Sequence, residues 1–220
     1  LAVLGAPIDV LLPSLDRLIE RHHDPDSGGF TTVVRGRASY WLGPSADTTA
    51  QVAWLLATLV PRRHPTLLRG AIDYLRREQE PEGGWVSRWY PSWVLPTFLA
   101  GRVLALDPHH RAALGRAKLR LIEQQDAEGS WAHSAIDTAA ALRLLDDPHS
   151  SACQRGLAWL HARCHAGRWA GEPILSYWFD ADAPGRPRRL YLSVDDGRIT
   201  TAYVRLALAR FESSMTRRST

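Results

Sequence analysis

Two aspartates, Asp47 and Asp137, stand at the start of apolar segments that are expected to be helices. They belong to the similar segments Ser45–Ala50 and Ser134–Ala139. Burial of a carboxyl group in an apolar cavity raises its pKa, because burial disfavours the charged form, and such a group can act as a general acid near neutral pH. Aspartate in the first turn of a helix also serves a structural role, since it caps backbone N–H groups and complements the helix dipole. The sequence leaves both roles open.

Aromatic and polar residues near the same helix starts complete the candidate site. Aromatic faces stabilise cations at close range, so they would suit a cationic intermediate, and they would equally fill the centre of the fold. His133 lies between a motif tryptophan and the next helix and is a candidate base. The residues assigned to substrate binding are Trp54, Tyr90, Trp93, Glu172, Tyr177, Trp178 and Tyr203.

An internal repeat organises the chain. The segment Glu123–Trp131 combines a glutamine pair, a short acidic turn, a glycine and a tryptophan, and the segment Glu78–Trp85 repeats this order. Looser copies end at Phe30 and Trp169. The aromatic anchors recur roughly every 40–55 residues, which is typical of units of two helices. One unit cannot bury its apolar face alone, so neighbouring units must stack.

The apolar spacing predicts an all-α chain of about eight helices in four hairpins. The second helix of each pair is almost wholly apolar, which is typical of a buried helix, so these helices are expected inside and the others outside. A small β-hairpin is expected near 190–200, where apolar residues precede the turn signal Asp195–Gly197. The expected helices cover about 8–22, 44–59, 65–79, 91–106, 109–125, 134–145, 148–163 and 200–208, within one domain, 1–220, of repeats about 8–60, 65–106, 109–146 and 148–211.

The segments from Gln79 to Trp85 and from Gln125 to Trp131 resemble the QW repeat of squalene–hopene and oxidosqualene cyclases. Class II diterpene cyclases share this repeat, and protein prenyltransferase β subunits carry a looser version. The likeness covers about residues 8–210 and implies an α/α toroid with a central apolar cavity. Family barrels have about six hairpins, so about four imply a short or partly open toroid, or one completed by a homodimer.

The resemblance also implies a chemistry. The cyclisation acid of the family lies in an Asp-x-Asp-Asp-Thr-Ala motif at the start of an inner helix, with its third residue as proton donor. Asp47 matches the donor and Asp137 the aspartate after it, although no repeat carries the whole motif. The implied function is acid-initiated cyclisation or isomerisation of an apolar, isoprenoid-derived substrate. The alternatives are a non-catalytic toroid that binds a lipid or a partner, and a prenyl-diphosphate-dependent transferase.

Composition restricts the remaining partners. The net charge is +4, but the basic residues are dispersed and form no known module, so nucleic acid is not an expected partner. Cys153 and Cys164 form no metal-ligand spacing, and no cofactor is predicted, with Mg²⁺ needed only for a diphosphate substrate. No apolar run approaches the ~20 residues of a membrane span. A cytoplasmic protein with peripheral membrane contact for substrate uptake is expected.

Overall fold

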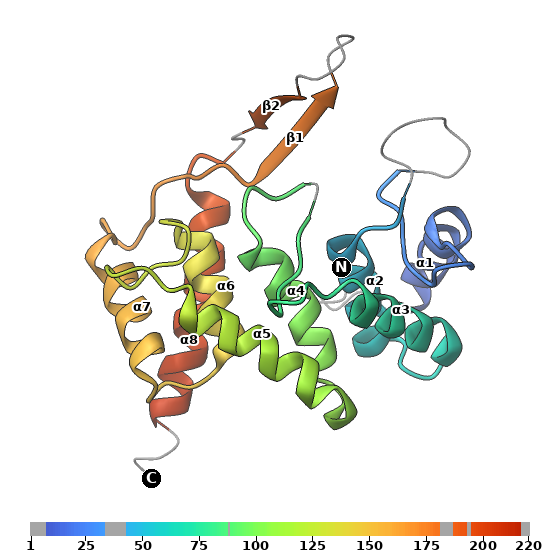
Figure 1. Ribbon diagram of the computed structural model, residues 1–220, viewed down its shortest axis with the longest axis horizontal. Helices are drawn as coiled ribbons and strands as arrows, with labels where there is room; N and C mark the ends of the chain where they lie inside the picture. The colour runs from blue at the N-terminus through green and yellow to red at the C-terminus, as the bar shows by residue number, and fades with distance from the viewer. Residues whose placement is uncertain (1–7, 34–42, 88, 181–186, 193–194, 217–220) are drawn as a thin grey trace.

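The computed structural model describes residues 8–33, 43–87, 89–180, 187–192 and 195–216 (Figure 1). Eight α-helices and one two-stranded antiparallel sheet make up the described elements. The helices are α1 (Ile8–His22), α2 (Ala46–Leu59), α3 (Pro65–Arg77), α4 (Val94–Leu104), α5 (Arg111–Glu123), α6 (Ala135–Leu145), α7 (Ser151–Ala162) and α8 (Arg198–Thr216), with a 3₁₀-helix at Pro108–His110. None of these helices is long and apolar enough to cross a bilayer.

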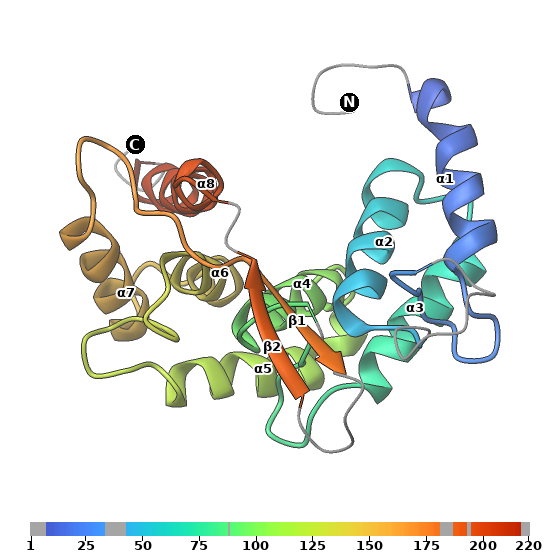
Figure 2. The same cartoon turned by 90° about the horizontal axis from the view of Figure 1, so that it is seen from above.

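The helices form two layers, as the sequence predicts. The inner layer packs in the order α2, α4, α6 and α8, and these helices follow an arc in Figure 2. Helices α1, α3, α5 and α7 lie on the convex side of this arc. Ten of the eleven residues of α6 are buried, whereas α1 has no buried residue, so the all-apolar helices are the inner ones. The fold is therefore an α/α toroid of helical hairpins, seen here as an open arc.

The β-hairpin lies earlier in the chain than the sequence predicts. Strand β1 (Leu175–Asp180) pairs with β2 (Pro187–Leu192), and the hairpin projects away from the helices on the side of the loop before α4 (Figure 1). Asp195 is not in a hairpin turn but caps α8, because its carboxylate accepts hydrogen bonds from the N–H groups of Ile199 and Thr200, each at 2.9 Å. Capping by aspartate and turn formation use the same residue types, which explains the misplacement.

Candidate functional site

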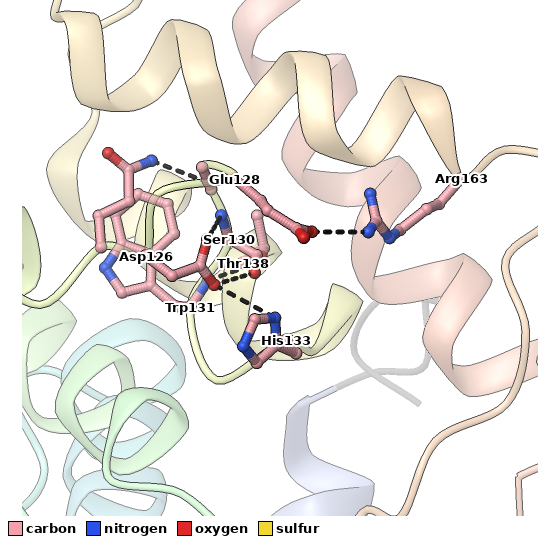
Figure 3. Close-up of polar contacts among 9 residues, drawn as sticks. Asp126, Glu128, Ser130, Trp131, His133, Thr138 and Arg163 are labelled. Carbon is pink, nitrogen blue, oxygen red and sulfur yellow. Dashed lines mark hydrogen bonds and ion pairs between the residues drawn. The ribbon is translucent and has the colours of Figure 1, made fainter.

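The repeat motif ties each outer helix to the start of the following inner helix. The indole Nε1 of Trp131 donates to the Leu121 carbonyl at 2.7 Å, and its backbone N–H donates to Thr138 Oγ1 at 3.1 Å (Figure 3). Thr138 is in the first turn of α6. The other repeats place Thr49, Thr97 and Thr201 in the same role, at 2.8, 3.0 and 3.1 Å from the backbone nitrogens of Phe30, Trp85 and Trp169. The motif thus fixes the helix starts that carry the candidate acids.

The motif glutamine joins adjacent repeats. Gln125 Nε2 donates to the carbonyls of Gly129 and Ala152, both at 2.8 Å, and Ala152 belongs to the next outer helix. Gly129 has φ +98°, and a Cβ there would lie 2.8 Å from the Arg155 carbonyl oxygen, so the turn requires glycine. Gln79 and Gly83 repeat this arrangement one unit earlier. These residues are structural.

Asp137 is buried at the start of α6 and connects two inner helices. It is 5% exposed, and its Oδ1 accepts a hydrogen bond from the Leu95 N–H of α4 at 3.2 Å. The pKa of Asp137 is raised to about 6, chiefly by burial and also by the negative charge of Glu172, while hydrogen bonds from Ser92, Leu95 and Ser134 oppose the shift. The carboxyl group is therefore close to titration at neutral pH and also caps a neighbouring helix.

Glu172 caps α6 from outside that helix. Its carboxylate accepts hydrogen bonds from Ser134 Oγ and Ala135 N, each at 2.6 Å, and from Ile136 N at 3.3 Å. A carboxylate at this position satisfies the free N–H groups of the first turn and complements the helix dipole. Because these bonds hold Glu172 at the start of α6, Glu172 helps to fix the position of the helix turn that carries Asp137.

A pocket of about 260 Å³ brings three of the predicted residues together. Asp137, Glu172 and His133 line it with Ser92, Ser134 and two prolines among other residues. The His133 side chain is 72% exposed, and its Nδ1 lies 3.5 Å from Asp126 Oδ2 (Figure 3). His133 and the preceding Ala132 have φ of +51° and +54°, a left-handed conformation that is uncommon outside glycine. His133 therefore belongs to the pocket of Asp137.

Asp47 occupies a separate position on the concave side. It is 2% exposed in the first turn of α2, and its Oδ1 makes no hydrogen bond to any residue in the described ranges. The pKa of Tyr90 is raised to about 12, chiefly by burial and also by electrostatic interaction with Asp47 and Tyr203, while a hydrogen bond with Gln51 opposes the shift. These interactions place Asp47, Gln51 and Tyr203 near Tyr90.

Asp47 and Asp137 lie at the starts of two different inner helices. Asp47 begins α2 and Asp137 begins α6, and α4 packs between these two helices. The two acids start different inner helices because they come from the first and third hairpins, and each hairpin contributes one inner helix to the arc. The loop before α4 approaches both acids, through Tyr90 on one side and Ser92 on the other.

Towards the other end of the inner helices, two arginines cover the aromatic residues. The Arg102 guanidinium lies 4.8 Å from the ring centroid of Trp54 and 5.5 Å from that of Phe98, and Arg143 lies 4.6 Å from Phe98. The pKa of Arg102 is lowered to about 10, chiefly by burial and also by the charge of Arg143, while Tyr203 and Tyr90 oppose the shift. Both arginines were missed in the sequence, although a charged residue within an otherwise apolar inner helix is a usable signal.

The remaining predicted residues lie elsewhere. Trp93 stacks under the Arg120 guanidinium, 4.3 Å from its ring centroid, and so packs against α5 rather than the concave face. Its expected contact with substrate is not supported by this position. Tyr177 and Trp178 are in β1, but their side chains lie outside the described part of the structure. Among the described residues, no group of three or more histidine, cysteine, aspartate or glutamate side chains could hold a metal ion.

Comparison with known protein families identifies related sequences. The family model of the squalene-hopene cyclase C-terminal domain matches residues 40–139. The squalene-hopene cyclase of Schizosaccharomyces japonicus is 33% identical over 179 residues, which are 68% of this chain and 25% of that protein. The ent-copalyl diphosphate synthase of a Streptomyces species is 31% identical over 153 residues, or 63% of this chain and 29% of that protein. The chain thus spans between a quarter and a third of the length of these two relatives.

Solved structures share the fold. The type II terpene cyclase MstE from Scytonema, in complex with geranylgeranyl dihydroxybenzoate, has a TM-score of 0.70 at 20% identity, over 90% of this chain and 65% of that one. The ent-copalyl diphosphate synthase from Streptomyces platensis has a TM-score of 0.64 at 26% identity, over 89% of this chain and 37% of that one. The helical arc is therefore that of the terpene cyclase toroids.

Proposed function

The chain belongs to the superfamily of squalene–hopene cyclases and class II terpene cyclases, and from this premise we propose that its concave face performs an acid-initiated cyclisation or isomerisation. The proposed substrate is an apolar, isoprenoid-derived molecule. The observation that carries this proposal is the buried carboxyl group of Asp47, one oxygen of which has no hydrogen-bond partner in the described structure.

Asp47 is the proposed proton donor. A buried polar atom without a partner is costly, so such atoms persist where they serve a purpose. Its Oδ1 makes no hydrogen bond to any described residue, whereas Oδ1 of Asp137 is held by the Leu95 N–H. Asp47 also stands at the position that matches the donor of the family motif. We assign Asp137 a positioning role between α4 and α6.

The proposed reaction conserves the atoms of the substrate. The Asp47 proton forms a C–H bond with the π electrons of a terminal double bond, which leaves a cation on the adjacent carbon. A second double bond then attacks that cation and closes a ring, or the cation loses a proton directly and gives an isomer. The proton returns to a base or to water, and Asp47 is reprotonated from solvent. Tyr90, which lies near Asp47, and Tyr203, which lies near Tyr90, supply aromatic groups that would stabilise a cation.

Product analysis tests the assignment. The purified protein is incubated with polyprenyl diphosphates and neutral polyenes, and products are separated and weighed by mass spectrometry. Wild type should give a product of unchanged mass and new retention, and Asp47→Asn should give none. The matched control is Asp26→Asn, which removes an exposed carboxylate and should retain turnover. Full turnover by Asp47→Asn together with loss of turnover by Asp137→Asn would transfer the donor role to Asp137.

A second candidate function is a toroid that binds an isoprenoid without changing it. The two arginines on the concave face favour it, because their charges oppose a carbocation nearby and their guanidinium groups cover the rings of Trp54 and Phe98. The same incubation distinguishes the two functions. Recovery of bound but unaltered lipid from wild type would support the binding function and contradict the cyclase.

A further inference from the structure

We propose that the protein carries a binding site for a phosphate group on the convex side of the arc, where α3 and α5 lie (Figure 2). The site is separate from the concave face, and it does not depend on the function proposed above. Its ligand class is a phosphate monoester, which is either a soluble molecule or the head group of a phospholipid.

A pocket of about 420 Å³ lies where the two outer helices meet. Helix α3 contributes residues from its end, and α5 contributes its first turns together with the 3₁₀-helix before it. The ionisable residues that line the pocket are Asp73, Arg76, Arg77, His109, His110 and Arg116. Three guanidinium groups and two imidazoles thus share one pocket with a single carboxylate.

The carboxylate does not neutralise the arginines. Arg76 Nη1 lies 3.5 Å from Asp73 Oδ1, and both side chains are about half exposed, so this ion pair is weak. Arg77 donates to the Ser27 carbonyl and Arg116 to the side chain of a glutamine, and both acceptors are uncharged. Neither of these two arginines has a carboxylate partner in the described part of the chain. A guanidinium carries several N–H donors, so one such bond leaves others for an anion.

The next repeat shows that the fold does not need Arg76 and Arg77. The motif tryptophans donate their indole N–H to the carbonyls of Leu75 and Leu121, so these two leucines occupy equivalent positions. Arg76 and Arg77 follow the first leucine, whereas an isoleucine and a glutamate follow the second. Cations in the last turn of a helix complement its dipole, but the repeat forms equally with other residues at these two positions. The two arginines are therefore particular to this pocket.

Arg116, in contrast, also has a structural role. The motif glutamines donate to the carbonyls of Ala113 and Ala152, which makes these alanines equivalent. Arg116 and Arg155 stand three residues later, and each donates to the glutamine of its own repeat. Substitution of Arg116 would therefore disturb the repeat as well as the pocket. Arg76 is the better residue to test, because its one hydrogen bond among the described residues is with Asp73.

The start of α5 adds positive potential to the pocket. Ala112 and Ala113 belong to its first turn and line the pocket, and the dipole of a helix is positive at this end. His110 Nδ1 is buried and has no hydrogen-bond partner among the described residues, so the proton of the neutral ring belongs on Nε2 and makes that atom a donor. His109 is instead paired with Asp107, at 2.7 Å from Nδ1 to Oδ1.

A phosphate monoester fits this arrangement. Guanidinium groups bind phosphate by paired, charge-assisted hydrogen bonds, and a phosphate dianion offers acceptors to more than one arginine at once. The pocket shares His109 and Ala112 with an adjoining groove of about 490 Å³, which Pro108 and Arg111 also line. This groove gives room for the organic part of an ester. An ester is therefore a better match than inorganic phosphate.

Isothermal titration calorimetry with glycerol 3-phosphate tests the site, with glycerol as the uncharged probe. Wild type should bind the ester and not glycerol. Arg76→Glu should weaken binding of the ester at least about tenfold, because it replaces a donor of charge-assisted hydrogen bonds by a like charge. Asp73→Asn should strengthen binding about two- to threefold, because it removes the carboxylate that competes for Arg76.

Arg168→Glu is the matched control, because it makes the same change in net charge at an exposed arginine in the last repeat motif, outside the pocket. Its affinity for glycerol 3-phosphate should stay within about twofold of wild type, since exposed charges at a distance are screened by salt. Thermal unfolding confirms that each variant is folded. An equal loss of affinity in Arg76→Glu and Arg168→Glu would overturn the site, because net charge alone would then explain binding.

Sedimentation with phosphatidylcholine vesicles, with and without phosphatidic acid, distinguishes the two sources of the phosphate. Binding of glycerol 3-phosphate without sedimentation assigns the site to a soluble ester. Sedimentation that needs phosphatidic acid and is lost in Arg76→Glu assigns it to a lipid head group. Wild type that binds neither probe, or sedimentation that Arg76→Glu leaves unchanged, would overturn the site. Every readout is binding on the convex side, so failure of the proposed cyclase reaction would leave this result unaffected.

Discussion

Asp137→Asn should make the protein more stable at pH 8 and should have little such benefit at pH 4. The pKa of the Asp137 carboxyl is raised from its ordinary 3.8 to about 6, chiefly by burial. The folded protein therefore binds this proton more tightly than the unfolded chain. The stability that this carboxyl contributes is present below about pH 4 and is lost as the pH rises through 6. Asparagine does not titrate, so the variant does not lose this stability as the pH rises.

The size of the effect follows from the shift. One pKa unit corresponds to about 1.4 kcal/mol, so a shift from 3.8 to about 6 corresponds to about 3 kcal/mol over the whole titration. Between pH 4 and pH 8 the difference in unfolding free energy between variant and wild type should grow by about 2–3 kcal/mol. Other titrating groups are common to both proteins and largely cancel. The amide oxygen of asparagine can still accept the Leu95 N–H, so the cap of α4 is kept.

Urea unfolding at pH 4, 6 and 8, followed by circular dichroism, measures this difference, with Asp26→Asn as the control for the loss of one exposed carboxylate. A difference that stays constant with pH would refute the reasoning. A wild type that gains stability over Asp137→Asn as the pH rises would show that the hydrogen bonds to the carboxylate outweigh its burial.

Three further predictions use substitutions in and near the repeat. Gly129→Ala should lower the free energy of unfolding by more than about 1 kcal/mol, because a Cβ there meets a carbonyl oxygen of α7 at 2.8 Å and φ is +98°. Gly115→Ala in α5, where a Cβ meets open space, should raise it by about 0.5–1 kcal/mol. Thermal unfolding of the two variants compares these effects. Trp131→Phe should lower the free energy of unfolding in urea by about 1–3 kcal/mol, because it leaves the buried Leu121 carbonyl without its donor. An unchanged unfolding midpoint would show that the indole hydrogen bond does not contribute to stability. His133→Gly should raise the melting temperature, because glycine tolerates φ +51° and histidine does so at a cost; a lower melting temperature would show that the side chain contributes more than the strain costs.

The helices could be predicted because their signals are local. The apolar pattern and the repeat place α1 to α7 within a few residues of their observed bounds, and they assign α2, α4 and α6 to the inner layer. The end of the domain was harder to predict. Helix α8 extends to Thr216, beyond the expected 200–208, and the hairpin precedes it. Asp195 caps a helix in a sequence that equally suits a turn, so local composition does not decide between them.

The site could be predicted in part, because helix starts are visible in sequence and their arrangement in space is not. Asp137, His133 and Glu172 line one pocket, as residues near a single helix start should. The separation of Asp47 from Asp137 depends on which inner helices are neighbours, and the contact between Trp93 and Arg120 depends on how a loop enters α4. The Arg102–Arg143 pair was missed because the two residues are far apart in sequence and meet only through packing.

The most direct test of the central claim, that Asp47 initiates a reaction by protonation, is an incubation in deuterium oxide. The carboxyl proton of Asp47 exchanges with solvent, so an acid-initiated product should carry one deuterium and be one mass unit heavier than the same product formed in ordinary water. Asp47→Asn should form no such product, while Asp26→Asn should form it normally. A product that contains no deuterium, or a deuterated product made equally well by Asp47→Asn, would contradict the account.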